Sequence, residues 1–522
     1  MSIADARNQI ESRLAAERNT IAVGRDASIC LAYPSPYAVG MSSLGFQTLY
    51  RQLNEEGRGC HRAFLPDAWS PEALPWPQPR LPILSYEAAR PLSSYPIVGL
   101  SVAYELEVAG VIRMLEGTGI PVLAAERGPR DPIVLAGGPL TTTNPSVLLP
   151  FVDLLISGDG EHELPLALDR IAAAGSREAA LEAAAASPHV AIGEVEPGLF
   201  SALPTSARAP MERLPAYSAI TTPHTELADM FLVEPERGCS RRCSFCVMRG
   251  VSTGGMRFWE PDATLARIPA HAKRVGLVGA AVTDHPALEQ LVASVVERGH
   301  GVGVSSLRAD RLTPTLLENL RRGGYRQITV ASDGISERLR KVLHRGIKEE
   351  ALLRAAELVA QAGFRGLKLY QMIGAPTETD DDVDELIDTC KRLRGHGPLT
   401  LTISTFVAKR NTPLDGMPFL GVKPAEARLR KIRQGLGHNI GVRPQSPRWA
   451  HVEYLIAQRG PEGGHAALAA VRAGGRYRDW VRAYEALGPN TRGLVFGDEA
   501  RRAKRRGAAA KITDRPTLPV LE

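Results

Sequence analysis

Short runs of apolar residues alternate with amphipathic stretches over the first third of the chain. Strands are predicted at residues 28–33, 96–103, 120–124, 132–138 and 153–158, and helices at 43–53, 106–117 and 163–174. Continuous apolar strands that alternate with helices are typical of a parallel sheet covered on both faces. We therefore predict a doubly wound α/β domain over residues 26–175, preceded by a polar helix in residues 1–25. The proline-rich residues 60–92 give no assignment.

The same alternation returns after residue 229. Strands are predicted at 230–234, 274–282, 301–308, 327–333, 366–374 and 399–407, and helices at 261–272, 313–322, 349–362 and 380–394. Thr313 is predicted to cap the second of these helices. Six strand–helix units in sequence predict a partial (β/α)6 barrel over residues 230–415, joined to the first domain by a connector at 176–229. Such barrels gather their chemistry at the C-terminal ends of the strands.

Helices with basic and aromatic residues are predicted for residues 416–490. We interpret them as a small C-terminal helical module whose core contains Trp449, Tyr477 and Trp480; the alternative is that these aromatic residues line a substrate pocket. Residues 491–522 are predicted as a basic tail, and such a run is more often solvated than bound to RNA.

The amino-acid composition excludes several classes of protein. Hydrophobic residues make up 44% of the 522 residues, and no apolar run approaches the roughly 18 residues that cross a bilayer. The net charge of +6 is modest for this length, so nucleic-acid binding is not indicated. The cysteine positions do not form a disulfide framework. We expect a cytoplasmic, oxygen-sensitive protein without membrane attachment.

Half of the six cysteines stand within one short loop, directly after an apolar strand. In Glu236-Arg-Gly-Cys-Ser-Arg-Arg-Cys-Ser-Phe-Cys, the residues Cys239, Cys243 and Cys246 form a C-x-x-x-C-x-x-C spacing. Three thiolates on one loop can hold three irons of a cubic cluster and leave the fourth iron open to a small molecule. A zinc knuckle, which needs a fourth ligand nearby, and a chance spacing are the alternatives.

With the aromatic Phe245 before its last cysteine, this motif resembles that of the radical S-adenosylmethionine (radical SAM) superfamily. The resemblance implies a [4Fe–4S] cluster on the three cysteines, whose open iron chelates SAM. It also implies an electron donor such as flavodoxin or ferredoxin, which drives cleavage of the sulfonium to a 5′-deoxyadenosyl radical. No cysteine follows Cys390, which argues against a second cluster and therefore against a methylthiotransferase.

The resemblance further places SAM contacts at the barrel's strand ends. Besides Phe245, the expected SAM-binding residues are Gly279, Ala280, Ser305, Ser306, Arg308, Asp333, Arg345 and Gly374. Gly279-Ala280 stands where the family's glycine-rich motif receives the SAM amino group, but the acidic residue usual there is absent. Arg308 suits a carboxylate because its guanidinium is a planar fork, and Asp333 suits a ribose hydroxyl or a cationic group.

The first domain resembles the cobalamin-binding Rossmann-like domain of one large radical SAM class. The residues expected to contact cobalamin, which lie in glycine-rich loops at strand ends, are Gly137, Gly138, Gly158, Gly160 and Glu161. Plain turn chemistry is the alternative explanation for these glycines. The D-x-H-x-x-G signature that supplies an axial histidine is absent, and His61 lacks that context. Cobalamin is therefore expected to bind without a histidine ligand, or not at all.

These features predict a radical SAM enzyme that transfers a methyl group through cobalamin to an unactivated carbon of a small molecule or peptide. The first alternative is a cobalamin-free radical SAM enzyme that catalyses a rearrangement, dehydrogenation or cyclisation. The second is an RNA- or partner-binding scaffold with a structural cluster. No stretch of the sequence identifies the substrate.

Overall fold

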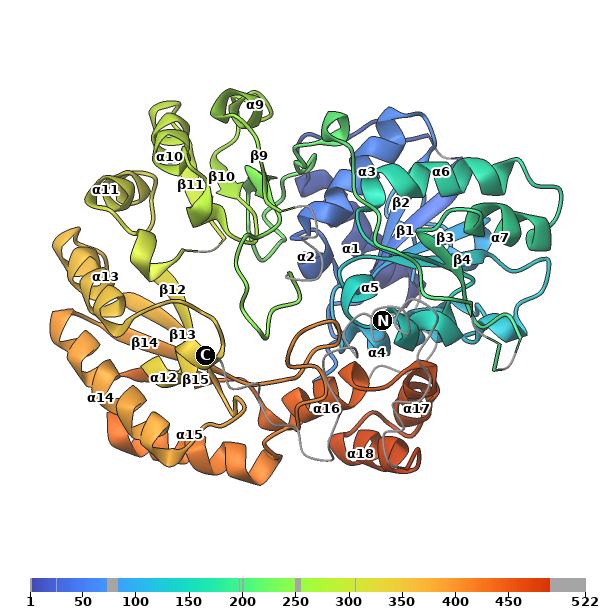
Figure 1. Ribbon diagram of the computed structural model, residues 1–522. Helices are drawn as coiled ribbons and strands as arrows, with labels where there is room; N and C mark the ends of the chain where they lie inside the picture. Colours follow the sequence, from blue (N-terminus) through green and yellow to red (C-terminus); the bar gives the residue numbers. More distant parts are fainter. Residues whose placement is uncertain are drawn as a thin grey trace.

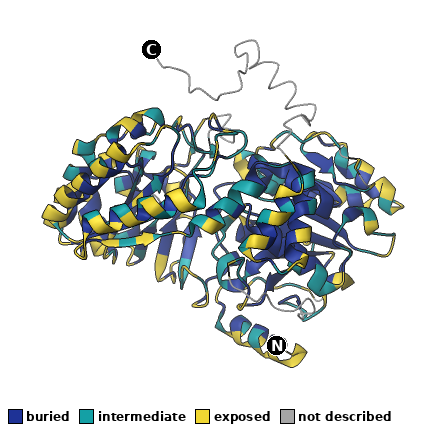
Figure 2. Ribbon diagram, turned by 90° about the horizontal axis from the view of Figure 1, so that it is seen from below, coloured by how far each residue is buried: buried dark blue, intermediate teal, exposed yellow. Residues whose placement is uncertain are grey.

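The computed structural model describes residues 2–24, 26–72, 83–196, 198–199, 201–248, 255–305 and 307–488. Ser306 and the predicted basic tail lie outside the described residues. Two α/β units lie side by side, the first in blue and teal and the second in green to orange (Figure 1). The sheet of the first unit is buried, and the outer faces of the helices are exposed in both units (Figure 2).

The first unit is built on a six-stranded sheet. In spatial order its strands are β2 (Cys60–Leu65), β1 (Ile29–Pro36), β3 (Ile97–Ser101), β4 (Ile133–Gly137), β5 (Leu154–Ile156) and β6 (Val190–Ile192). The first five in this order are parallel, and the edge strand β6 is antiparallel. The order β2-β1-β3-β4-β5 confirms a doubly wound sheet and puts its switch point between β1 and β3, where ligands bind in this architecture.

Helices cover both faces of this sheet. They are α1 (Ile3–Ala16), α2 (Tyr37–Gly40), α3 (Leu44–Glu55), α4 (Glu107–Thr118), α5 (Leu140–Thr143), α6 (Gly160–Ala172) and α7 (Arg177–Ala185), with the 3-10 helices η1 (Leu92–Ser94), η2 (Ala124–Glu126) and η3 (Pro145–Phe151). Because strand side chains alternate between faces, Leu31 and Leu135 pack with α3 and α6, whereas Val98 and Val134 pack with α4 and η3.

Three helices from the end of the chain complete the second face: α16 (Pro447–Ala457), α17 (Pro461–Arg472) and α18 (Tyr477–Glu485) (Figure 1). Trp480 is fully buried in the same core as α4 and η3. Asn144 donates hydrogen bonds to the carbonyls of Ile456 (3.0 Å) and Arg459 (2.9 Å). The C-terminal helices are therefore present as predicted, and they pack as part of the first unit.

The strand predicted at residues 120–124 is wrong. An extended segment leads there into η2, and Pro121 has no backbone N–H to donate to a neighbouring strand. Ile120 and Val122 are still buried in the core, which explains the apolar pattern. β2 and β6 were not predicted, and β6 with α7 extends this unit into the predicted connector.

The second unit is an open barrel of parallel strands. Around it run β11 (Gly301–Val304), β10 (Arg274–Leu277) and β7 (Met230–Val233) as one sheet, and β12 (Ile328–Gly334), β13 (Leu367–Ile373), β14 (Leu399–Thr405) and β15 (Gly441–Pro444) as another. A single parallel bridge between Leu307 and Val330 joins the two sheets. The six predicted strands are confirmed, and β15 adds a seventh that the sequence did not reveal.

Helices cover the outside of the barrel (Figure 1). They are α9 (Pro261–Leu265), α10 (Leu288–Glu297), α11 (Pro314–Arg322), α12 (Glu337–Val342), α13 (Glu349–Gln361), α14 (Asp380–His396) and α15 (Val422–Leu436). Thr313 caps α11 as predicted, since its hydroxyl accepts from the Leu316 N–H at 3.1 Å. α9 is shorter than predicted, and α10 and α12 were not predicted. α15 and β15 pack with the barrel, so the predicted unit 416–490 is divided between both halves of the molecule.

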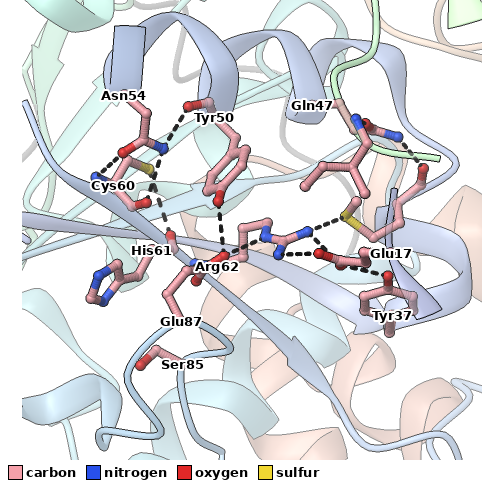
Figure 3. A network of polar contacts seen from close by, with 12 residues as sticks. Glu17, Tyr37, Gln47, Tyr50, Asn54, Cys60, His61, Arg62, Ser85 and Glu87 are labelled. Atoms are coloured by element: carbon pink, nitrogen blue, oxygen red, sulfur yellow. Dashed lines mark hydrogen bonds and ion pairs between the residues drawn. The ribbon is translucent and has the colours of Figure 1, made fainter. Parts of the chain in front are cut away.

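A buried ion network ties the first helix to the edge of the first sheet (Figure 3). Arg62 of β2 pairs with Glu17, just after α1, at 2.8 Å and with Glu87 at 2.6 Å. The hydroxyl of Tyr37 donates to Glu17 (2.7 Å) and that of Tyr50 donates to Glu87 (3.0 Å). Arg62 is 1% exposed, and loss of its guanidinium would leave the carboxylates of Glu17 and Glu87 without their cation.

The segment between the two units runs along β7. The Ser218 N–H donates to the Leu232 carbonyl (2.8 Å), and the Glu234 N–H donates to the Ala216 carbonyl (2.9 Å). This pairing holds the connector against the first barrel strand. None of the helices that the structure describes has the length and apolar character needed to span a bilayer.

Candidate functional site

The cysteine loop begins where β7 leads into β8 (Glu236–Arg237), which forms a two-stranded ribbon with β9 (Arg257–Phe258). Cys243 is buried, whereas Cys239 and Cys246 are half-buried. The Ser244 N–H donates to the Leu343 carbonyl (3.0 Å), so the turn after α12 supports the loop. Among the described residues, no group of three or more histidine, cysteine, aspartate or glutamate side chains is placed to hold one metal ion.

Burial raises the pKa of the Cys239 and Cys246 thiols. A hydrogen bond from the Arg241 N–H opposes this shift at Cys239, and one from the Met248 N–H opposes it at Cys246. Neutral thiols are poor metal ligands, so cluster assembly must release protons from these residues.

Arg241, which lies between the first two cysteines, anchors the loop to the barrel. Its guanidinium donates two hydrogen bonds to Asp284, at 2.8 and 2.7 Å, in the loop after β10. Burial acts to raise the pKa of Asp284, but the charges of Arg241, Arg308 and Arg311 outweigh it and hold this pKa below its usual value. Asp284 therefore carries a fixed negative charge beside the cysteine loop.

Glu236 of β8 places its carboxylate against the loop after β10. Its Oε1 accepts from the Ala281 N–H at 2.8 Å, and a Cβ at Gly279 would lie only 2.2 Å from this oxygen. Glu236 is fully buried, and its Oε2 has no hydrogen-bond partner within the described part of the chain. Burial raises the pKa of Glu236 to about 7. This contact has only a weak signal in the sequence, namely an acidic residue directly before the cysteine motif.

Ser305 supports the same loop from β11. Its hydroxyl accepts from the Gly279 N–H (3.1 Å) and donates to the Gly279 carbonyl (3.0 Å). Ala280 is exposed beside it. The structure thus brings together Gly279, Ala280, Ser305 and Glu236 at the ends of β8, β10 and β11.

Asp333, Arg345 and Arg308 form a second predicted group beside Cys246. A bulge at the end of β12 gives Asp333 a φ of 62°, and its carboxylate pairs with Arg345 at 2.5 Å. Burial raises the pKa of Asp333, although Arg345 and Arg308 oppose that shift, and Asp333 in turn raises the pKa of Cys246. Arg308 donates twice to Asp310, while its buried Nη1 has no hydrogen-bond partner among the described residues. A strained backbone beside charged groups is common at functional sites.

Two of the predicted SAM residues have structural explanations of their own. Gly374 has a φ of 79°, and its N–H donates to Glu378 (2.7 Å), so the turn after β13 alone requires a glycine there. Phe245 packs against a small core that contains Leu343 and Phe406.

The predicted cobalamin residues all line one cavity of about 310 Å³. It lies at the C-terminal ends of β1, β3, β4 and β5, and Gly137, Gly138, Gly158, Gly160 and Glu161 are part of its wall. Most of the remaining wall is apolar, and Arg237, Val247 and Met248 from the cysteine loop close it on the barrel side. The switch point of the first sheet therefore opens directly onto the cysteine loop.

Close backbone packing explains two of these glycines. A Cβ at Gly138 would lie 2.7 Å from the Val102 carbonyl oxygen, and one at Gly158 would lie 2.3 Å from that of Ala207. Both have positive φ, at 102° and 92°. A Cβ at Gly137, by contrast, would meet no atom closer than 3.8 Å.

His61 is buried and is not available as an axial ligand to cobalt, because both of its ring nitrogens have hydrogen-bond partners. Nδ1 lies 2.5 Å from the Tyr95 hydroxyl and Nε2 lies 2.9 Å from the Gly24 carbonyl oxygen. No histidine is among the described residues that line the cavity.

A larger cleft of about 860 Å³ opens at the ends of β13, β14 and β15. Phe245 and Trp449 contribute aromatic walls. On one side, Lys409 pairs with Glu105 of the first unit and Glu453 of α16, both at 2.5 Å. Trp449 therefore lines a pocket, as the alternative interpretation of the C-terminal aromatic residues stated, whereas Trp480 belongs to a core.

Comparison with known proteins bears on both units. Residues 233–390 match the family described as the radical SAM superfamily, and residues 45–192 match the one described as radical SAM proteins, N-terminal. An uncharacterized protein of Methanocaldococcus jannaschii is 31% identical over 191 residues, which are 35% of this chain and 42% of that protein. The match thus spans less than half of that relative.

Among solved structures, the chain resembles the cobalamin-dependent S-adenosylmethionine radical enzyme OxsB. With aqua-cobalamin and S-adenosylmethionine bound, that enzyme aligns with a TM-score of 0.48 and 12% identity, over 93% of this chain and 75% of that one. Its apo structure aligns with a TM-score of 0.46 and 13% identity, over 70% of this chain and about half (52%) of that one.

The fold and the cysteine loop define an α/β protein with a cluster-type cysteine motif at the mouth of an open barrel. Its barrel belongs to the radical SAM superfamily, and an N-terminal region of radical SAM proteins precedes it. The superfamily implies a [4Fe–4S] cluster and SAM, together with a substrate and an electron donor.

Proposed function

We propose that Cys239, Cys243 and Cys246 hold one [4Fe–4S] cluster, at which the protein reductively cleaves SAM. The observation that carries this proposal is the position of the three thiols on one loop at the barrel mouth, anchored by the Arg241–Asp284 pair. In the cleavage, one electron from a donor such as flavodoxin or ferredoxin breaks a carbon–sulfur bond of the sulfonium. The products are methionine and a 5′-deoxyadenosyl radical, which takes a hydrogen atom from the substrate.

The residues around the cluster loop suit the groups of SAM. The unpartnered Oε2 of Glu236 and the carbonyls near Gly279 can accept from the SAM ammonium. The unpartnered Nη1 of Arg308 can donate to its carboxylate. Asp333, held by Arg345, can accept from a ribose hydroxyl. Ala280, Ser305, Phe245 and Gly374 remain predicted contacts at the edges of this site.

The cavity at the switch point is proposed to hold part of a corrinoid. Its volume of about 310 Å³ is too small for the whole molecule, but its apolar wall and the open space at Gly137 suit the nucleotide tail. When bound there, cobalamin supplies a carrier for a methyl group beside the cluster loop. No described histidine reaches the cavity, so the corrinoid would be held without a histidine ligand.

The reaction proposed is methyl transfer from SAM, by way of cobalamin, to an unactivated carbon. The small-molecule or peptide substrate would enter through the cleft that Phe245 and Trp449 line, since this cleft lies at the ends of the barrel strands. Cobalamin-free radical chemistry is the second candidate, because Gly138 and Gly158 are required by backbone packing even without a ligand.

Anaerobic reconstitution with iron and sulfide, followed by dithionite and SAM, tests the proposal. We expect about four irons per chain and formation of 5′-deoxyadenosine and methionine, both measured by mass spectrometry. The Cys243→Ser variant should lose both the cluster and the products. Formation of products by the variant, or their absence in the wild-type protein with a full cluster, would overturn the proposal.

A further inference from the structure

The cavity of the first unit and the cysteine loop share their walls. Arg237 lies two positions before Cys239, and Val247 and Met248 directly follow Cys246; all three line the cavity. A ligand in the cavity would therefore touch the chain on both sides of the three cysteines. The opposite wall includes Asp159, in the loop after β5, and Glu161, in the first turn of α6.

Arg237 connects these two walls. Its guanidinium is 18% exposed and pairs with Glu161 at 2.7 Å, with Asp159 at 3.2 Å and with Glu234 at 2.8 Å. Arg257 of the neighbouring strand β9 also pairs with Asp159, at 3.0 Å. Five charged groups thus join the first sheet to the ribbon that carries the cysteine loop, and the carboxylates exceed the guanidinium groups by one.

A glycine with positive φ stands next to the ion group on each side. Gly238, between Arg237 and Cys239, has a φ of 100°, and Gly158, directly before Asp159, has a φ of 92°. At Gly238 a change in backbone angle reorients Cys239, whereas Gly158 is held closely against Ala207. The position of the Arg237 guanidinium therefore influences how Cys239 is presented, and its ion pairs link that position to Asp159 and Glu161 in the wall of the cavity.

We propose that Arg237 is a positioning residue that couples the ligand cavity of the first unit to the cluster of the barrel. Ligand in the cavity fixes the Asp159–Glu161 wall and, through Arg237, the loop that presents the thiols. If the ligand strengthens cluster binding by a certain factor, linkage requires that the assembled cluster strengthen ligand binding in the cavity by the same factor. This inference rests on the proposed function, namely a cluster on the three cysteines and a corrinoid in the cavity.

The test is a binding cycle with hydroxocobalamin as the probe. Its Kd is measured by anaerobic equilibrium dialysis on the full chain, first without and then with the reconstituted cluster. For the wild-type protein we expect affinity to rise about fivefold or more when the cluster is present, because coupling between sites usually has at least this size. The rate at which a chelator removes iron should fall when hydroxocobalamin is bound.

Three variants separate positioning from general stability. The affinity ratio is the Kd for hydroxocobalamin without the cluster divided by the Kd with the cluster. Arg237→Gln should lower this ratio to about one, while the variant still binds hydroxocobalamin alone and still assembles the cluster alone. Glu161→Gln removes only one of three carboxylates, so it should fold even where Arg237→Gln does not, and it should lower the ratio part of the way. Arg58→Gln is the matched control, since Arg58 pairs with Glu56 and Asp169 away from the cavity; it should keep the wild-type ratio.

The outcomes are distinguishable. A ratio of one in the wild-type protein, or an unchanged ratio in both Arg237→Gln and Glu161→Gln, would overturn the coupling while leaving the proposed function intact. Failure of the wild-type protein to bind hydroxocobalamin in either state would instead overturn the corrinoid assignment, and the coupling with it.

Discussion

A single methyl group at Gly279 tests the proposed SAM site. In the Gly279→Ala variant the new Cβ would lie 2.2 Å from Oε1 and 2.8 Å from Cδ of Glu236. Glu236 is fully buried and its Oε1 already accepts from the Ala281 N–H, so moving the carboxylate away breaks this hydrogen bond. Either that bond is lost or the loop that carries Gly279 and Ala281 must shift.

The size of the effect follows from this clash. One extra carbon in a packed site costs about 1–3 kcal/mol. If SAM binding requires the unshifted loop, this strain opposes binding and raises the Kd for SAM by roughly 5- to 150-fold. The Ser244 N–H, which donates to the Leu343 carbonyl, holds the cysteine loop from an element outside the shifted loop, so the cysteines are not displaced. Iron content should therefore stay at the wild-type level.

The assay is anaerobic equilibrium dialysis of SAM against the reconstituted protein, with iron measured in the same samples. Gly395→Ala is the matched control, because a Cβ at Gly395 in α14 meets no atom within 4 Å. An unchanged Kd for SAM in Gly279→Ala would refute the placement of SAM at this loop. Equal loss of iron and SAM binding would show that the loop serves the cluster instead.

Three further predictions concern stability and cluster retention. Burial raises the pKa of Glu107 from 4.5 to about 7; the folded state therefore keeps a proton that the unfolded state loses, and the unfolding free energy of the apoprotein should fall as pH rises from about 4.5 to 7. Glu107→Gln, which stays neutral, should be more stable than the wild-type protein at pH 8 by up to ~3 kcal/mol in urea unfolding, and equal slopes against pH would contradict this. Asp284→Asn removes the charge that anchors Arg241, at a cost of about 1 kcal/mol, and should speed iron loss to a chelator about fivefold, whereas an unchanged rate would show that the loop needs no such anchor. Arg62→Met should destabilise the apoprotein by about 3–5 kcal/mol, because Glu17 and Glu87 would remain buried without a cation; a loss below 1 kcal/mol would mean that water reaches them.

The pattern of apolar residues was sufficient to predict most of the strands of both units, because buried parallel strands are continuous apolar runs. It failed at residues 120–124, where the apolar residues Ile120 and Val122 are buried without forming a strand. It also missed β15, whose residues Gly441-Val-Arg-Pro form no apolar run, as well as β2 and β6.

The C-terminal helices show a different limit. Their amphipathic pattern predicts helices, but it does not say which apolar surface they cover. Trp480 lies in a core with α4, which is more than 350 residues earlier in the chain, so this packing depends on the whole fold.

For the site, the cysteine spacing carried nearly all of the information. Gly279 and Glu236 are adjacent because β7 and β10 pair in parallel and end side by side at Val233 and Leu277, and no local pattern encodes that contact. The ion pairs of Arg237 with Asp159 and Glu161 likewise join residues that lie far apart in sequence and belong to different units. The cavity that Arg237, Asp159 and Glu161 line could be expected from the strand order of the first sheet, but not from its glycine-rich loops alone.

The most direct test of the central claim is anaerobic reconstitution with iron, sulfide and hydroxocobalamin, followed by visible spectra of the desalted protein. The proposed function predicts a cluster absorption band together with one bound corrinoid per chain. A cluster band without corrinoid would contradict the corrinoid site and favour cobalamin-free radical chemistry, and the absence of a cluster band would contradict the assignment of the three cysteines.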